Sequence, residues 1–144
     1  MLVPESVPRE MKSACADALW LILDRLSHPS IACCWDVANA SMIGEHPSVS
    51  VPTLGTRIQY VQVKDAKLGP LGASFCKLGE GDIPVQKLLI RLRGIGYQGW
   101  VSMEWEKAWL PGLAEPEEIL PDSIKKLREW TSPKVEEKGK KKEP

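Results

Sequence analysis

Three short strand-like runs, each leading into an acidic residue, constrain the fold of this chain most strongly. They are IACCWD (31–36), RIQYVQVKD (57–65) and WVSMEWE (100–106). The first run is apolar up to its aspartate and has no glycine or proline, which is typical of a strand buried on both faces in a parallel sheet. The second run, rich in β-branched and aromatic residues, predicts another strand. We therefore expect three strands whose ends carry carboxylates.

Helical patterns separate and flank these strands. Residues 8–27 show helical spacing, with one apolar face formed by Met11, Ala14, Ala18, Leu21, Ile22 and Leu26. Residues 84–95 predict a second helix, with Asp82 as its N-cap and an apolar face of Val85, Leu88, Leu89 and Leu92. Residues 114–130 predict a last helix that bends or begins at Pro121. Strands that alternate with helices predict an α/β fold with a parallel, helix-covered sheet.

Length and charge narrow the class of protein. The 144 residues suit one domain, which we assign to residues 1–131, followed by a charged and disordered tail at 132–144. Nineteen basic residues balance nineteen acidic ones, so no bulk charge attracts nucleic acid or a membrane surface. No apolar run reaches the ~20 residues of a membrane span, and the first residues lack a secretory signal, so we expect a cytoplasmic protein. The four cysteines are expected to be reduced and buried.

The strand ends are the candidate site. Ligands of parallel α/β sheets bind at the carboxyl ends of the strands, where this sequence places Asp36, Lys64 with Asp65, and Glu104. The period of two puts Cys34 and Asp36 on one face of their strand, and Cys33 and Trp35 on the other. Converging carboxylates repel unless a cation or proton lies between them, which favours a divalent metal. An acid after a strand is also a common helix N-cap, and both interpretations stay open.

Three segments resemble a known family. The motifs WDVANA, VQVKDAK and CKLGEGDIPVQKLLIRLRGIGYQGWVSMEWE are similar to the sugar phosphate isomerase/epimerase family of xylose isomerase-like TIM barrels, over roughly residues 15–131. The resemblance implies a partial (β/α)8 barrel made of the last three parallel strands with flanking helices. It also implies proton transfer next to the carbonyl of a sugar or sugar phosphate, assisted by a divalent metal (Mn, Mg, Zn or Co).

The resemblance also assigns roles to single residues. Asp36 matches the aspartate metal ligand, and Glu104 matches a glutamate that is both metal ligand and catalytic base. Gln62 stands where the family has a histidine ligand, so the metal would be weakly held. Lys64 would polarise a substrate oxygen. The loop residues Glu80 and Asp82 match a GEGD motif near the mouth of the barrel.

A non-catalytic alternative stays open beside the enzyme. A whole barrel needs ~250 residues, so the chain could be a truncated lobe that forms a homo-oligomer or pairs with a complementary N-terminal half-barrel. The family's endonuclease branch needs several histidines for its zinc site and is disfavoured, because the chain has two. We expect both of these, His28 and His46, to be surface or capping residues. Trp105 and Trp109 are the candidates for stacking on a sugar.

Overall fold

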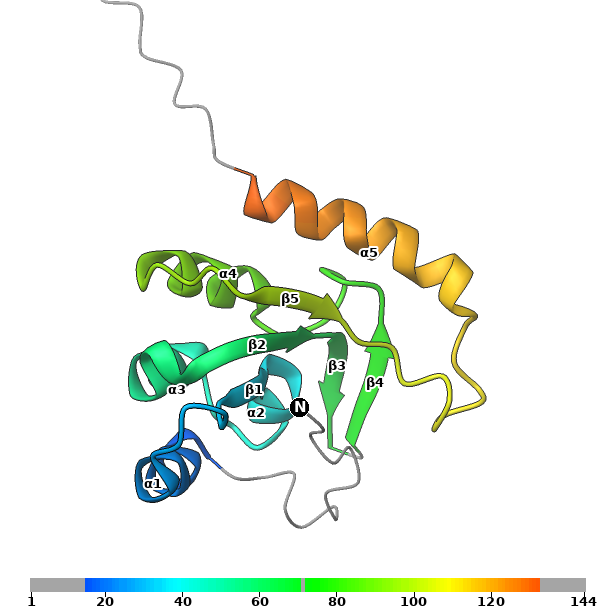
Figure 1. Cartoon of the computed structure of the whole chain (residues 1–144). Helices are drawn as coiled ribbons and strands as arrows, with labels where there is room; N and C mark the ends of the chain where they lie inside the picture. The colour runs from blue at the N-terminus through cyan, green and yellow to red at the C-terminus, as the bar shows by residue number, and fades with distance from the viewer. Residues whose placement is uncertain (1–14, 71, 133–144) are drawn as a thin grey trace, which may run out of the picture.

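A three-stranded parallel sheet forms the centre of the fold (Figure 1). The computed structural model describes residues 15–70 and 72–132. Strands β1 (Cys33–Asp36), β2 (Ile58–Val63) and β5 (Trp100–Met103) lie in the order β1-β2-β5. All three are parallel, so their carboxyl ends meet at one edge. This confirms the predicted α/β fold with three strands of a partial TIM barrel. Residues 1–14 and 133–144, which include most of the predicted tail, lie outside the description.

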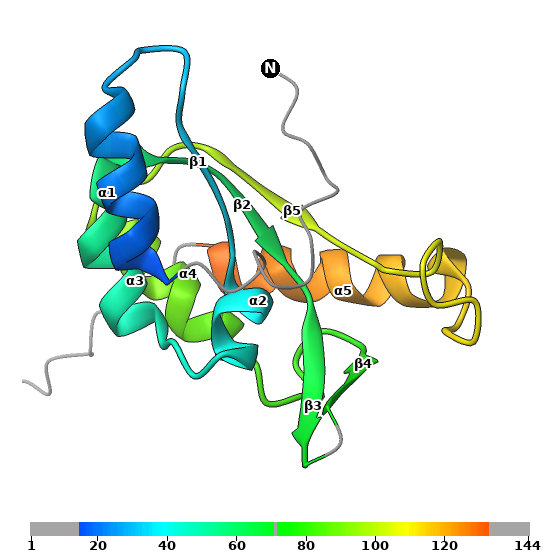
Figure 2. The ribbon, with the colours of Figure 1, turned by 90° about the horizontal axis from the view of Figure 1, so that it is seen from below.

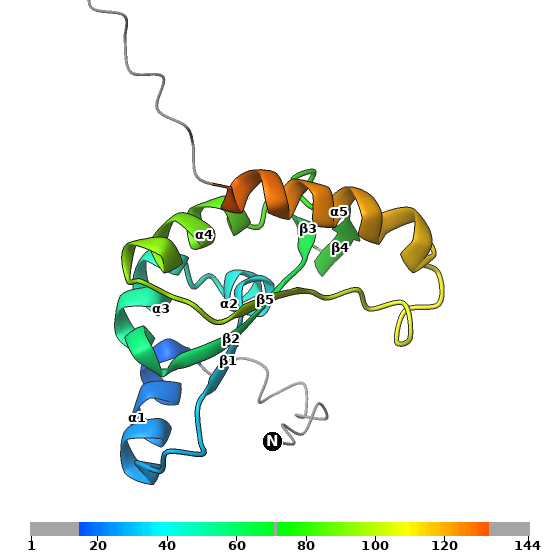
Figure 3. The same ribbon diagram turned by 45° about the horizontal axis from the view of Figure 1, so that its top comes forward.

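The longer helices lie along one side of the strands (Figure 3). They are α1 (Ala16–Leu26), α3 (Pro47–Leu54), α4 (Val85–Gly94) and α5 (Pro116–Thr131). A short α2 (Val37–Met42) follows β1 directly, and a 3-10 turn (Gly55–Arg57) precedes β2. Among these described helices, none is both long and apolar enough to span a membrane.

The two faces of the sheet differ as the period of two predicts. On the helix side, Cys33, Trp35, Val61 and Val63 are buried in the core. On the opposite side, Cys34, Tyr60 and Gln62 are half-buried, and Trp100 is 79% exposed. This second face is the one that would line the interior of a closed barrel.

The apolar face predicted for the first helix is wrong within the described residues. Leu21, Ile22 and Leu26 are exposed, whereas Ala16 and Leu23 are buried and Leu19 and Trp20 pack against the core. Apolar residues surround most of this helix, so periodicity alone could not say which side contacts α3. Met11 and Ala14 lie outside the described part of the chain.

The glycine-rich segment between β2 and α4 contains a β-hairpin. Strand β3 (Asp65–Gly69) pairs antiparallel with β4 (Gly72–Cys76), and the hairpin extends past the end of β2 (Figure 2). The predicted N-cap is also wrong, because Pro84 precedes α4 without a side-chain cap. Asp82 instead accepts a hydrogen bond from the Leu68 backbone N–H at 2.8 Å. Helix α5 begins at Pro116 and continues through Pro121.

The four cysteines are free, as predicted, but only one of them is buried. Cys33 is 2% exposed, Cys34 and Cys76 are half-buried, and Cys15 is exposed. Burial, with a smaller contribution from Cys34, raises the pKa of Cys33 to about 12. A thiol reacts as its thiolate, so Cys33 is both shielded and chemically quiet.

We predict that the native chain reacts with iodoacetamide first at Cys15 and at Cys33 only after unfolding. Peptide mass spectrometry after timed labelling gives the order, and labelling in urea gives the fully reactive control. Labelling of Cys33 as fast as Cys15 in the native chain would contradict the assignment of Cys33 to the helix-covered face.

Candidate functional site

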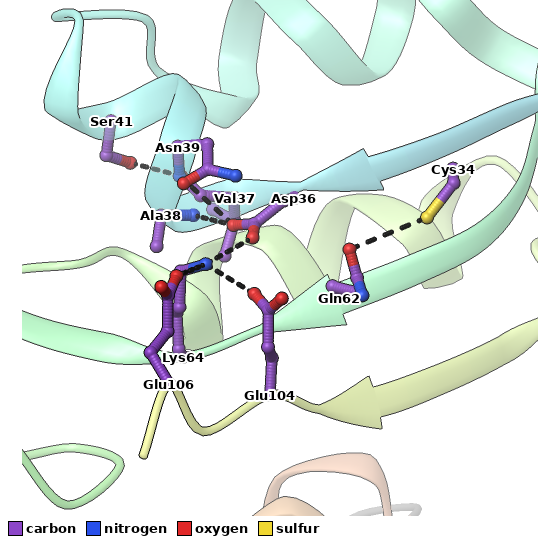
Figure 4. Close-up of polar contacts among 10 residues, drawn as sticks. All are labelled: Cys34, Asp36, Val37, Ala38, Asn39, Ser41, Gln62, Lys64, Glu104 and Glu106. Atoms are coloured by element: carbon purple, nitrogen blue, oxygen red, sulfur yellow. Dashed lines mark hydrogen bonds and ion pairs between the residues drawn. The ribbon is translucent and has the colours of Figure 1, made fainter. Parts of the chain in front are cut away.

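The side chain of Lys64 occupies the centre of the carboxyl edge of the sheet (Figure 4). Its Nζ lies 2.9 Å from Asp36 Oδ2 and 2.7 Å from Glu106 Oε1, and it also donates a hydrogen bond to Glu104 Oε2. The Lys64 side chain is only 1% exposed. The ammonium donates hydrogen bonds to Glu104 and Glu106, whereas Asp36 pairs with it by charge. We call these four residues the ion cluster.

Asp36 serves the ion cluster and the local fold together. Its Oδ1 accepts hydrogen bonds from the backbone N–H groups of Ala38 (2.7 Å) and Asn39 (3.0 Å), which caps α2. Its Oδ2 is buried and accepts no hydrogen bond from residues 15–70 and 72–132, so the nearby Lys64 ammonium compensates it by charge. The helix-cap interpretation of this acid is therefore confirmed, and its role in a functional site stays a prediction.

Glu104 and Glu106 approach the ion cluster from the segment after β5. The Glu104 N–H donates to Val63 O at 2.9 Å, which extends the sheet by one residue. The side chains of Glu104 and Glu106 are 30% and 17% exposed, so they form the solvent-facing side of the cluster. Glu106 was not among the site residues predicted from the sequence. Its signal was the two-residue spacing from Glu104, which keeps both acids on one face of an extended segment.

Burial and charge act against each other in the cluster. Burial alone would lower the pKa of Lys64, but the charge of Asp36 and the hydrogen bonds to Glu104 and Glu106 outweigh it and raise this pKa above its usual value. Burial also raises the pKa of Glu104, and Asp36 adds to the rise while Lys64 opposes it. The cluster therefore keeps a permanent ammonium beside a carboxyl group that holds its proton more readily than usual.

The arrangement does not fit a metal held by Asp36, Gln62 and Glu104. The Gln62 Oε1 faces Cys34 Sγ at 3.6 Å, and its side chain points away from the ion cluster (Figure 4). The Lys64 ammonium already lies between Asp36 and Glu104. In residues 15–70 and 72–132, no group of three or more His, Cys, Asp or Glu side chains is arranged to hold a metal ion. The metal assignment made from the resemblance stays a prediction.

Asp65, next to Lys64, organises the glycine-rich loop. Its carboxylate oxygens accept four hydrogen bonds, with N···O distances of 2.7–3.1 Å, from the backbone N–H groups of Ala66, Gly79, Gly81 and Ile83. A Cβ at Gly81 would lie 2.2 Å from Asp65 Oδ1 and 2.6 Å from Ala66 O, so only glycine fits there. Asp65 thus fixes the loop that runs from the hairpin to α4, and is 1% exposed.

The other residues selected from the sequence have separate positions. Glu80 and Asp82 are exposed in the loop that Asp65 holds. His46 caps α3 by accepting the Ser48 N–H, and His28 accepts the Ser30 N–H, as expected for capping residues. Trp109 is 75% exposed, whereas Trp105 Nε1 donates to Ala114 O at 3.0 Å.

Comparison with known proteins gives one family. The model of the xylose isomerase-like TIM barrel family matches residues 2–130. The uncharacterized protein YihM of Escherichia coli K12 is 35% identical over 71 residues, which cover 46% of this chain and 22% of YihM.

Solved structures show the same fold at low sequence identity. D-allulose 3-epimerase from Methylomonas sp., in complex with D-allulose, is 16% identical with a TM-score of 0.65, over 79% of this chain and 42% of the epimerase. The IolI protein with a bound zinc atom is 19% identical with a TM-score of 0.64, over 80% of this chain and 42% of IolI. The chain therefore spans less than half the length of these structures.

We predict that Asp65→Asn lowers the free energy of unfolding by about 2–4 kcal/mol, because an amide N–H₂ would face backbone donors in place of one carboxylate oxygen. Urea denaturation followed by tryptophan fluorescence measures the change. Asp82→Asn is the matched control: that acid is exposed and accepts one N–H, so we expect a loss within about 1 kcal/mol. Equal losses in the two variants would show that Asp65 does not organise the loop.

Proposed function

This chain belongs to the xylose isomerase-like TIM barrel family, whose solved relatives include sugar epimerases, and we propose that it acts in a sugar isomerase or epimerase. The reaction would move a proton at the carbon beside a carbonyl. The observation that supports this most is the ion cluster, which gathers three carboxylates and an ammonium at the carboxyl edge of the sheet. That edge is where TIM barrels bind their substrates.

Glu104 is the proposed acid/base. It is less buried than Asp36, so a substrate that enters from solvent can reach it. Burial and the neighbouring Asp36 raise its pKa, which brings it closer to the neutral range in which a carboxyl group both accepts and donates a proton. Lys64 is the proposed partner, since its ammonium holds Glu104 by a hydrogen bond and would polarise a substrate oxygen that approaches the cluster.

The metal-dependent form of this reaction remains a separate proposal. In that form this chain would contribute three metal ligands, Asp36, Gln62 and Glu104. A divalent cation bound there would polarise the sugar oxygens. The zinc atom in IolI supports a metal in the family. The geometry of this chain supports it less, because Gln62 is turned toward Cys34 and Lys64 lies between the two acids.

The proposed substrate is a sugar or sugar phosphate. The D-allulose bound to the Methylomonas epimerase supports a ketose. The exposed Trp109 ring lies in the segment after Glu106, where it could stack on a sugar, while Trp105 is tied to Ala114. A substrate would be enclosed only when further strands close the barrel, because the three strands here leave the inner face open at Trp100.

The same open face supports a second candidate function, a non-catalytic lobe that associates through its sheet. Trp100 on this inner face is 79% exposed. Exposed apolar groups of this size favour association with a second copy or with a complementary half-barrel.

We predict that the chain catalyses exchange of a carbon-bound proton of a ketose with solvent, and that Glu104→Gln abolishes it, because an amide cannot accept the proton. Proton NMR of a ketose panel in D₂O, with the full chain and with either added Mn²⁺ or added EDTA, measures the exchange. Glu118→Gln is the control, since Glu118 is exposed on α5, away from the cluster, and should leave the rate unchanged.

Absence of exchange for every ketose, under both conditions, would overturn the enzyme proposal. Sedimentation velocity on the same samples then decides the second candidate. For a lobe that associates through its inner face we expect a dimer or larger species, and Trp100→Lys should shift it toward the monomer. If the wild type and Trp100→Lys are both monomers, the proposal of a non-catalytic, associating lobe is overturned too.

A further inference from the structure

The ion cluster already contains a cation at its centre. Lys64 Nζ lies 2.9 Å from Asp36 Oδ2 and 2.7 Å from Glu106 Oε1, and it is hydrogen-bonded to Glu104. These contacts come from three separate segments: the end of β1, the end of β2 and the residues after β5. A single ammonium therefore does for these carboxylates what a bound metal ion does elsewhere, which is to offset their repulsion.

We infer that Lys64 is the resident cation of this site and excludes a divalent metal from it. A metal bound to Asp36 Oδ2 and Glu104 Oε2 would need the position that the ammonium holds, because both oxygens contact Nζ. Two positive ions cannot share that position, since the repulsion between them is strong where water is scarce. The inference uses the proposed function only for the role of Glu104.

The surroundings give Lys64 little freedom to leave. Its side chain is 1% exposed, and its backbone is fixed between the last residue of β2 and the buried Asp65. The Phe75 ring of β4 lies over Nζ with its centroid at 5.8 Å, so the hairpin covers the ammonium from one side. Displacement by a metal would require these buried neighbours to move as well.

Gln62, the other residue predicted to bind the metal, is not free to do so. Gln62 lies two residues before Lys64, and its Oε1 accepts a hydrogen bond from Cys34 Sγ at 3.6 Å. Asp36 Oδ1 is committed to the N–H groups that begin α2. Removing the lysine charge would free Asp36 Oδ2, a buried oxygen that accepts no hydrogen bond from the described residues, together with one oxygen of each glutamate.

Lys64 is therefore a positioning residue with a testable signature. It holds Glu104 in place and keeps the site independent of metal. A lysine with a merely structural role would weaken the fold when replaced, but its loss would not create a metal site. Gain of metal binding on loss of Lys64 distinguishes the two roles.

The test titrates the full chain with Mn²⁺ and follows free Mn²⁺ by electron paramagnetic resonance. We expect the wild type and the exposed-lysine control Lys87→Met to leave Mn²⁺ free. Lys64→Met should bind one Mn²⁺ per chain, at least ~10-fold more tightly than the wild type, the size of effect that changes around metal ligands produce. Lys64→Arg keeps the charge and should still exclude Mn²⁺.

Two results would overturn the inference. One is saturable binding of one Mn²⁺ per wild-type chain that is lost in Asp36→Asn. The other is a folded Lys64→Met, judged by far-UV circular dichroism, that binds Mn²⁺ no better than the wild type. If Lys64→Met does not fold, the wild-type melting temperature decides: no change between Mn²⁺ and EDTA supports the inference, and a rise with Mn²⁺ overturns it.

These readouts use no sugar, so they are independent of the exchange experiment. Ketose exchange that persists in EDTA would support both proposals. Exchange that needs Mn²⁺ would overturn the lysine inference and leave the isomerase proposal standing. A wild type that excludes Mn²⁺ and exchanges no sugar would support the inference and count against the enzyme.

Discussion

The ion pairs between Lys64 and three carboxylates tie the sheet together at the edge where its chemistry would occur. They join the ends of β1 and β2 to the segment after β5, and Asp36 continues the connection into α2 through its backbone hydrogen bonds. Burying such charges costs several kcal/mol per ion, and the attraction between them offsets this only when every partner is present. Removing one partner of a buried pair typically costs ~3–5 kcal/mol, whereas an apolar replacement of the whole group is often neutral. The cluster therefore contributes more to the placement of its carboxylates than to the free energy of unfolding of the chain.

The adjacent residues Lys64 and Asp65 have different roles, although both lie at the end of the same strand. Successive side chains at the end of a strand point to opposite faces. Lys64 therefore reaches the ion cluster, while Asp65 reaches the backbone N–H groups of the glycine-rich loop. Through this pair, the loop that leads into α4 and the acids of the neighbouring strands are fixed to the same point of the backbone. Substitution of either residue is therefore expected to disturb both the ion cluster and the glycine-rich loop.

Strand periodicity and the alternation of strands with helices were enough to predict the parallel sheet, whereas the hairpin, the buried face of α1 and the cation of the ion cluster were not predicted. The period of two in β1 put Trp35 and Asp36 on opposite faces, and the parallel arrangement brought Asp36 and Glu104 to one edge. Which cation lies between them depends on where the flexible Lys64 side chain goes, and no spacing rule reports that. The hairpin Asp65–Cys76 was missed because glycine and proline divide its segment into two short runs. The buried face of α1 was predicted wrongly because a helix with apolar residues around most of its surface does not indicate its own partner.

The ion cluster needs fewer strands than the enclosure of a substrate does. All four cluster residues come from three neighbouring strand ends, so the cluster forms without any further strand. Enclosure is different, because the inner face of the sheet remains open at Trp100 and the relatives with bound sugar or metal are more than twice as long as the part matched here. A carbonyl oxygen polarised by an ammonium gains most when water is excluded, since the interaction strengthens as the local dielectric falls. It follows that closure of the inner face would set how strongly the cluster acts on a sugar, while the identity of its cation is decided locally by Lys64.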